Sequence, residues 1–133
     1  MTRFNSIIED ERVLTAGFLP NRMLHRDSER HEIANALNPI LEDGQPRNIL
    51  LYGPPGTGKS TMADYVVEKL KEHDSSVTWG SVNCWKYPSR FKVYYQLLQD
   101  MGARMLHRTG TPTDELVERF EEKIRSRPSV VIL

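Results

Sequence analysis

The sequence contains a single cysteine, Cys84, so no disulfide can form within the chain. We expect Cys84 to be a small buried residue at the end of a strand rather than a reactive thiol. The four histidines are scattered, and none has metal-ligand spacing with a cysteine or a carboxylate partner. The sequence therefore predicts a reducing compartment and no zinc site.

Long apolar runs and an excess of charge of either sign are also missing. No run of about 18 apolar residues occurs, so we expect no membrane span, and the N-terminal residues lack the apolar core of a secretory signal. Lys plus Arg and Asp plus Glu both total 18, which gives a net charge of zero. This balance argues neither for nor against nucleic acid, and any basic surface would have to be local. We expect a cytoplasmic protein.

One stretch matches the phosphate-binding pattern G-x-x-x-x-G-K-[ST] at every fixed position. We call it the phosphate loop, and it consists of Gly53, Pro54, Pro55, Gly56, Thr57, Gly58, Lys59, Ser60 and Thr61. The glycines let the backbone approach a phosphate chain closely, and the prolines stiffen the loop. A helix starting near Gly58 would point its free N–H groups at the phosphates. We expect Lys59 to reach the β- and γ-phosphates, and Ser60 to bind Mg²⁺ with Thr61 beside it.

The flanks of the phosphate loop support a nucleotide site. Residues 48–52, Asn-Ile-Leu-Leu-Tyr, predict a buried parallel strand, and residues 58–72 predict a helix with one apolar face. A strand, a loop and a helix in this order form the context in which the pattern binds phosphate. The alternative interpretation is an ordinary Gly/Pro turn between a strand and a helix.

The remaining patterns predict further helices and strands. We expect an arm over residues 1–20, with a disordered tail as the alternative, and a helix over 27–41 that kinks or ends early at Pro39. We also expect an edge strand over 77–83, helices starting near 88 and 112, and a third buried strand over 129–133. Apolar and aromatic residues repeat at helical spacing from Phe91 to Met105. We expect this stripe to pack in the core, whereas the alternative role is to stack nucleic-acid bases.

Several stretches resemble the archaeal replication-initiator AAA+ proteins, relatives of the eukaryotic origin recognition complex and cell-division-control initiators. They are Leu19-Pro20, His25-Arg26-Asp27, the 48–51 strand, the phosphate loop and Val82-Asn83-Cys84. The resemblance covers about residues 4–133. It implies an α/β fold, namely a partial AAA+ three-layer phosphate-loop fold, with residues 21–133 forming the N-terminal part of the ATPase domain.

The resemblance also implies a function. The family binds ATP, recognises duplex DNA at origins and helps to load the replicative helicase. The resemblance implies ATP or ADP and Mg²⁺ as cofactors. It also implies that adenine binds near Pro20, His25 and Arg26, and that Lys59 and Ser60 contact the phosphates. The family's Mg²⁺-binding acid, catalytic Glu, lid and winged-helix domain would lie beyond Leu133. We therefore expect an ATP-binding portion of an initiator that does not hydrolyse ATP or bind DNA alone, with AAA+ self-association as an open option.

The same resemblance implies the order 5-1-4-3-2 for the strands of the sheet, which would here be truncated after the third strand. The third strand can pair with the second, but residues 48–52 would lack both neighbours, so their backbone groups would be unpaired. We therefore predict a marginally stable or oligomeric product. Two other functions stay open: a small phosphate-loop nucleotide kinase, and a remnant that is inert or serves only as an interaction module.

Overall fold

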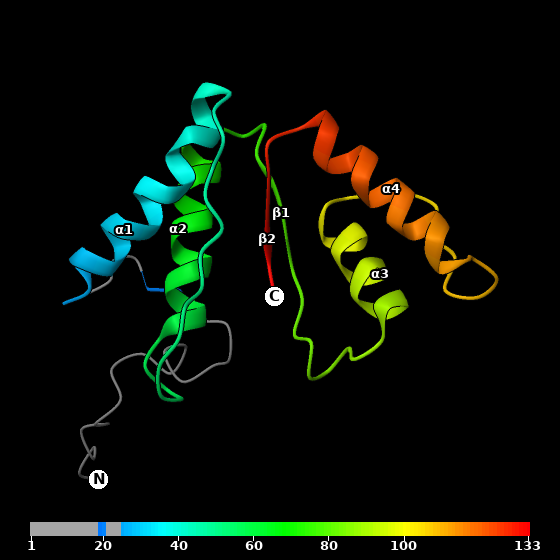
Figure 1. The fold of residues 1–133 in the computed structure, drawn as a ribbon, viewed down its shortest axis with the longest axis horizontal. Coiled ribbons are helices and arrows are strands. Elements are labelled where there is room, and N and C mark those ends of the chain that lie inside the picture. Colours follow the sequence, from blue (N-terminus) through cyan, green and yellow to red (C-terminus); the bar gives the residue numbers. More distant parts are fainter. Residues whose placement is uncertain (1–18, 21–24) are drawn as a thin grey trace, which may run out of the picture.

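The computed structural model describes residues 19–20 and 25–133. Its elements in chain order are α1 (Asp27–Leu37), the 3₁₀ helix η2 (Asn38–Glu42), α2 (Lys59–His73), β1 (Thr78–Ser81), α3 (Arg90–Asp100), α4 (Thr113–Ser126) and β2 (Ser129–Ile132). Figure 1 shows β1 and β2 between the pair α1–α2 and the pair α3–α4. The predicted α/β class with helices on both sides of a parallel sheet is confirmed.

The sheet of the described residues has two parallel strands. β1 and β2 pair with Thr78 opposite Ser129 and Ser81 opposite Ile132. The hydroxyl oxygens of Thr78 and Ser129 lie 3.0 Å apart, and just beyond β1 the Val82 N–H donates to the Ile132 carbonyl at 2.9 Å. The predicted pairing of the second and third strands is therefore confirmed.

Residues 48–52 do not form the predicted strand. This segment overlaps α2 in the view of Figure 1, and no strand among the described residues pairs with it. Leu50 is 83% exposed and Tyr52 is 88% exposed. Strand structure requires a neighbouring ladder, and an apolar sequence alone cannot supply one. The prediction of a buried strand is wrong, whereas the prediction that this segment lacks partners is confirmed.

Helix α2 joins the two apolar clusters of the described part. The first cluster lies between α1 and α2, and half-buried Leu19 packs against it. The second contains Val67 of α2 together with Val77 and Val130, next to the strands. Because Val66 belongs to the first cluster and Val67 to the second, two different faces of α2 are buried. The helix that carries the end of the phosphate loop is therefore held from two directions.

Proline ends the regular part of the first helix, as predicted. α1 stops at Leu37, and Pro39 lies in the 3₁₀ helix that follows. The predicted arm falls outside the described residues, apart from Leu19 and Pro20. Within the described residues, no helix combines the length and apolar character that crossing a membrane requires.

The third long helix is shorter than its apolar repeat suggests. α3 begins at Arg90, where the Ser89 hydroxyl accepts a hydrogen bond from the Lys92 N–H at 3.3 Å, and ends at Asp100. Met105 lies beyond the helix, has a positive φ of 58° and is 81% exposed, so its assignment to the buried stripe is wrong. Tyr94 instead packs edge to face on Phe120 of α4, with ring centroids 5.2 Å apart. This contact supports the packing role predicted for the aromatic residues.

Cys84 is exposed, contrary to the prediction. β1 ends at Ser81, and the Asn83 side chain accepts hydrogen bonds from the N–H groups of Trp85 and Lys86, at 3.0 and 3.2 Å. An asparagine side chain that bonds the backbone two residues on forms a turn. The turn starts before the cysteine and places Cys84 on the surface.

Candidate functional site

The phosphate loop wraps around open space. Gly56 and Gly58 have φ of 76° and 82°, a left-handed backbone that costs other residues roughly 1–2 kcal/mol. A Cβ added at either glycine would meet nothing within 4 Å. Backbone conformation, and not crowding, therefore requires glycine at these positions. The backbone at these two glycines is therefore open to close approach by a ligand.

Helix α2 presents unpaired donors to this space. It begins at Lys59, directly after Gly58, and no side chain caps its first turn. Met62 is the first residue whose N–H bonds back along the helix, to the Gly58 carbonyl at 2.9 Å. The N–H groups of residues 59–61 have no partner within the helix, as at any helix start. Together with the helix dipole, these groups favour a negatively charged ligand.

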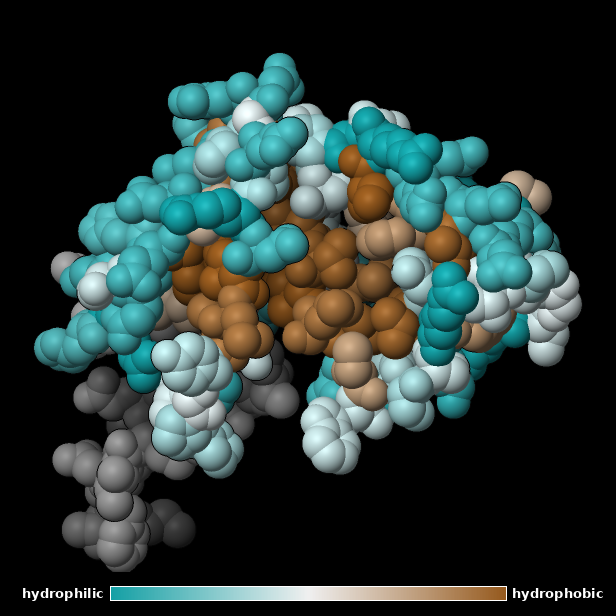
Figure 2. Space-filling view, viewed as in Figure 1, coloured by the Kyte–Doolittle hydropathy of each residue, from teal (hydrophilic) through white to brown (hydrophobic). Residues whose placement is uncertain are grey.

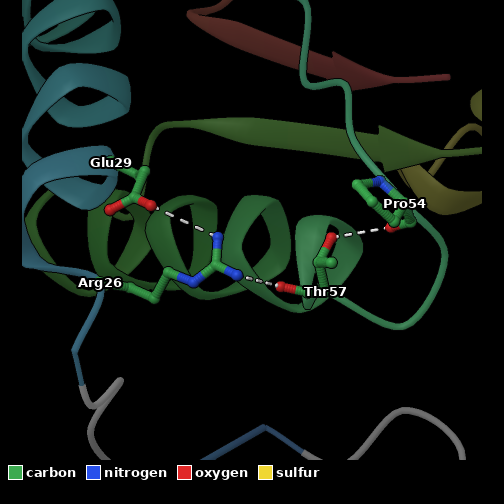
Figure 3. Close-up of polar contacts among 4 residues, drawn as sticks. All are labelled: Arg26, Glu29, Pro54 and Thr57. Atoms are coloured by element: carbon green, nitrogen blue, oxygen red, sulfur yellow. Dashed lines mark hydrogen bonds and ion pairs between the residues drawn. The ribbon is translucent and has the colours of Figure 1, made fainter.

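The Lys59 ammonium is held by the opposite end of the loop. Its Nζ donates to the carbonyls of Gly53 at 3.0 Å and Pro54 at 2.7 Å. The Thr57 hydroxyl donates to the same Pro54 carbonyl at 2.9 Å (Figure 3). The loop is therefore closed on itself by contacts from Thr57 and Lys59 to its first two residues. Lys59 is half-buried and Ser60 is exposed.

Arg26 reaches the loop from the start of α1. Its Nη2 donates to the Thr57 carbonyl at 2.7 Å, and its Nη1 lies 3.4 Å from the Glu29 carboxylate (Figure 3). The resemblance to the initiator family implies that Arg26 lies beside adenine together with Pro20 and His25, and that role stays a prediction. Pro20 is half-buried, and His25 is exposed with a φ of 59°. Of these three predicted residues, Arg26 is the one with a hydrogen bond to the loop among the described residues.

An open cleft of about 630 Å³ adjoins the loop, between α1, residues 47–52 and the start of α2. Of the predicted site residues, it is lined by Arg26, Gly58 and Lys59. Sequence reasoning missed three charged lining residues, Glu29, Glu32 and Arg47. The spacing of the two glutamates, three residues apart on the predicted first helix, placed them on one face but did not show that a cleft lies there.

A magnesium site is not assembled by the described residues alone. No group of three or more His, Cys, Asp or Glu among them is placed to hold a metal ion. One turn along α2 from Ser60, burial raises the pKa of Asp64, and the neighbouring Glu68 charge raises it further. The assignment of Ser60 as a Mg²⁺ ligand stays a prediction.

Residues 22–131 match the family described as the AAA ATPase domain, and the chain belongs to this family. Among curated proteins, it is 37% identical over 129 residues to ORC1-type DNA replication protein 9 of Halobacterium salinarum, covering 96% of this chain and 36% of that protein. It is 39% identical over 115 residues to ORC1-type DNA replication protein 1 of the same organism, and this match covers 86% of this chain and 37% of that protein. The chain therefore spans about a third of the length of these relatives.

Solved structures show the same fold. The Aeropyrum pernix ORC1 protein in complex with DNA superimposes with a TM-score of 0.74 and 29% identity, over 90% of this chain and 32% of that one. The Aeropyrum pernix ORC2 protein, solved as ADPNP–ADP complexes, superimposes with a TM-score of 0.72 and 20% identity, over 92% of this chain and 34% of that one. The second likeness concerns the fold alone. The resemblance to archaeal replication initiators is confirmed.

Proposed function

We propose that this chain is the ATP-binding portion of an ORC1-type replication initiator, with residues 21–133 forming the N-terminal part of its ATPase domain. The observation that carries the proposal is the phosphate loop: left-handed Gly56 and Gly58, unpaired N–H groups at the start of α2, and the Lys59 ammonium within the loop. These groups supply close backbone approach, neutral donors and a positive charge. Triphosphate binding needs all three.

Each residue has a role in this proposal. Lys59 supplies a charge-assisted donor to the phosphates, which is stronger than a neutral one. The N–H groups of residues 56–61 line the cradle, stiffened by Pro54 and Pro55. The Ser60 hydroxyl would hold Mg²⁺, which neutralises phosphate charge when bound. Pro20, His25 and Arg26 lie on the side proposed for adenine.

We further propose that the 133 residues bind ATP or ADP without sustained turnover. Among the described residues, no group of three or more His, Cys, Asp or Glu side chains is placed to hold a metal ion by itself. Origin DNA and a replicative helicase would be partners of a longer, cytoplasmic initiator. The relative solved in complex with DNA supports the first of these partners. The balanced charge of this chain gives no support for DNA binding by these residues alone.

Calorimetric titration with Mg·ATP tests the proposal. We expect the chain to bind and Lys59→Ala to lose at least about tenfold in affinity, because a charge-assisted hydrogen bond is removed. Lys69→Ala is the matched control, since Lys69 lies on the same helix and pairs with Glu72 at 2.6 Å. Absence of binding in a sample with a cooperative thermal transition would defeat the proposal. Phosphoryl transfer to a nucleoside monophosphate would favour the kinase alternative.

A further inference from the structure

The peptide between Thr57 and Gly58 is anchored from outside the phosphate loop. Its carbonyl oxygen accepts the 2.7 Å hydrogen bond from Arg26 Nη2. None of the described peptides is cis, and in a trans peptide the C=O and N–H point in opposite directions. The contact that fixes the Thr57 carbonyl therefore also fixes the Gly58 N–H, on the side away from Arg26.

This peptide needs an anchor because glycine follows it. Gly58 has a φ of 82° and no Cβ, so both signs of φ are open to it and the peptide can turn over at little steric cost. A turned peptide would present the carbonyl, a hydrogen-bond acceptor, where a phosphate needs a donor. The peptides that follow are fixed by helix α2, which begins at Lys59.

The other contacts that close the loop do not perform this task. The Lys59 ammonium and the Thr57 hydroxyl both bond to carbonyls at the beginning of the loop, those of Gly53 and Pro54. Among the described residues, Arg26 is the side chain that bonds the Thr57 carbonyl. Its planar guanidinium offers several donors, and a second nitrogen lies near the Glu29 carboxylate.

We propose that Arg26 is a positioning residue that holds the Thr57–Gly58 peptide so that the Gly58 N–H stays available to phosphate. The proposal rests on the proposed function, because it presumes that the loop binds phosphates. It differs from the adenine contact expected from the sequence. A residue that positions the loop acts on the phosphate chain alone, whereas an adenine contact requires the base.

Two ligands and three variants separate these roles. Mg·ATP and magnesium tripolyphosphate, which has no base, are titrated calorimetrically into the full chain, Arg26→Gln, Arg26→Lys and Arg30→Gln. Arg30 is the matched control, since it lies in α1 four residues after Arg26 and pairs with Asp27 at 3.0 Å. A thermal melt without ligand confirms that each variant is folded.

We expect Arg26→Gln to lower the affinity for both ligands by the same factor, about tenfold, because one charged hydrogen bond is lost. Arg26→Lys should recover part of the loss, because an ammonium can donate to the same carbonyl. Arg30→Gln should bind as the unmodified chain does. A loss confined to ATP would overturn the proposal and favour the adenine contact. Equal affinities in Arg26→Gln and Arg30→Gln would also overturn it.

An amide NMR spectrum without ligand provides a measurement that does not depend on the proposed function. The Gly58 resonance should move in Arg26→Gln and less in Arg26→Lys, and stay in place in Arg30→Gln. If the unmodified chain binds neither ligand, the proposed function fails, and the Gly58 resonance still tests the anchor. If Arg26→Gln does not fold, Arg26→Lys carries the same test. An unmoved Gly58 resonance in the folded Arg26 variants would overturn the proposal.

Discussion

Two stretches with similar apolar sequences have opposite surroundings in this molecule. In β2, Val130 is 8% exposed, lies opposite Trp79 of β1 and packs with Val67 of α2. In the segment 48–52, Leu50 is 83% exposed and no described strand lies beside it. The apolar pattern is common to both, so the neighbours make the difference. A strand in a parallel sheet is defined by its ladder as much as by its residues.

The comparison also shows what the phosphate loop depends on. The loop follows directly after the unpaired segment, yet its contacts come from α1, α2 and the loop itself. α2 is in turn fixed by apolar clusters on two sides. The candidate site is therefore built by helices and local hydrogen bonds, and it forms without a paired strand on its N-terminal side.

The largest expected effect comes from placing the same charge in each stretch. Val130→Asp buries an unpaired carboxylate and should lower the free energy of unfolding by about 3 kcal/mol or more. Leu50→Asp, at a position exposed in the monomer, should change it by less than about 0.5 kcal/mol at protein concentrations low enough to keep the chain monomeric. Urea unfolding followed by circular dichroism measures both. Equal losses would show that residues 48–52 are buried as deeply as β2.

The second prediction is that the chain self-associates through its exposed apolar residues. Figure 2 shows apolar side chains gathered at the centre of one face, and the exposed large apolar residues include Ile49, Leu50, Leu51, Val131 and Leu133. An apolar segment with unpaired edges favours association. Sedimentation should show oligomers that Leu50→Lys weakens by about tenfold or more, since burying a leucine contributes about 1.5–3 kcal/mol.

A concentration-independent, cooperative thermal transition of the unmodified monomer would contradict this expectation. Thr113→Lys is a suitable control, because it adds the same charge at the start of α4, on another element.

The third prediction compares two glycines in the left-handed region. Gly58 and Gly102 have φ of 82° and 74°, and an added Cβ would meet nothing within 4 Å at either. Each change to alanine should cost roughly 1–2 kcal/mol of stability. Of the two variants, only Gly58→Ala should also lower the affinity for Mg·ATP, because Gly102 lies outside the loop. Equal binding by the two variants in calorimetry would show that the Gly58 backbone has no part in the site.

The smallest effect concerns Asp64 on α2, the helix common to both regions. Burial raises its pKa above the ordinary 3.8, so the folded state holds a proton that the unfolded state releases. The free energy of unfolding therefore falls as the pH rises from 3.8 through the raised pKa of folded Asp64. Because solvent screens this partly exposed carboxylate, Asp64→Asn should raise the free energy of unfolding only slightly at pH 7, and not at a pH well below 3.8. A gain of equal size at both pH values would refute the burial of Asp64.

The sequence alone predicts the local backbone around the phosphate loop better than it predicts the sheet. The left-handed glycines of the loop, the start of α2 after Gly58 and the early end of α1 before Pro39 depend on local backbone chemistry. The structure confirms these local elements, whereas phosphate binding by the loop stays a prediction. The state of residues 48–52 depends on strands far away in sequence, which an apolar pattern cannot supply. Cys84 and Met105 were misplaced because turns end β1 and α3 early. The Arg26–Thr57 contact spans 31 residues and leaves no periodic signal.

Amide hydrogen exchange with and without Mg·ATP tests the central claim most directly, namely that helices and local hydrogen bonds form the site beside an unpaired strand segment. We predict that the N–H groups of residues 56–60 become protected when Mg·ATP is added. Those of residues 49–52 should exchange rapidly in both states, and those of β1 and β2 slowly. An unprotected loop in saturating Mg·ATP, while β1 remains protected, would contradict the account.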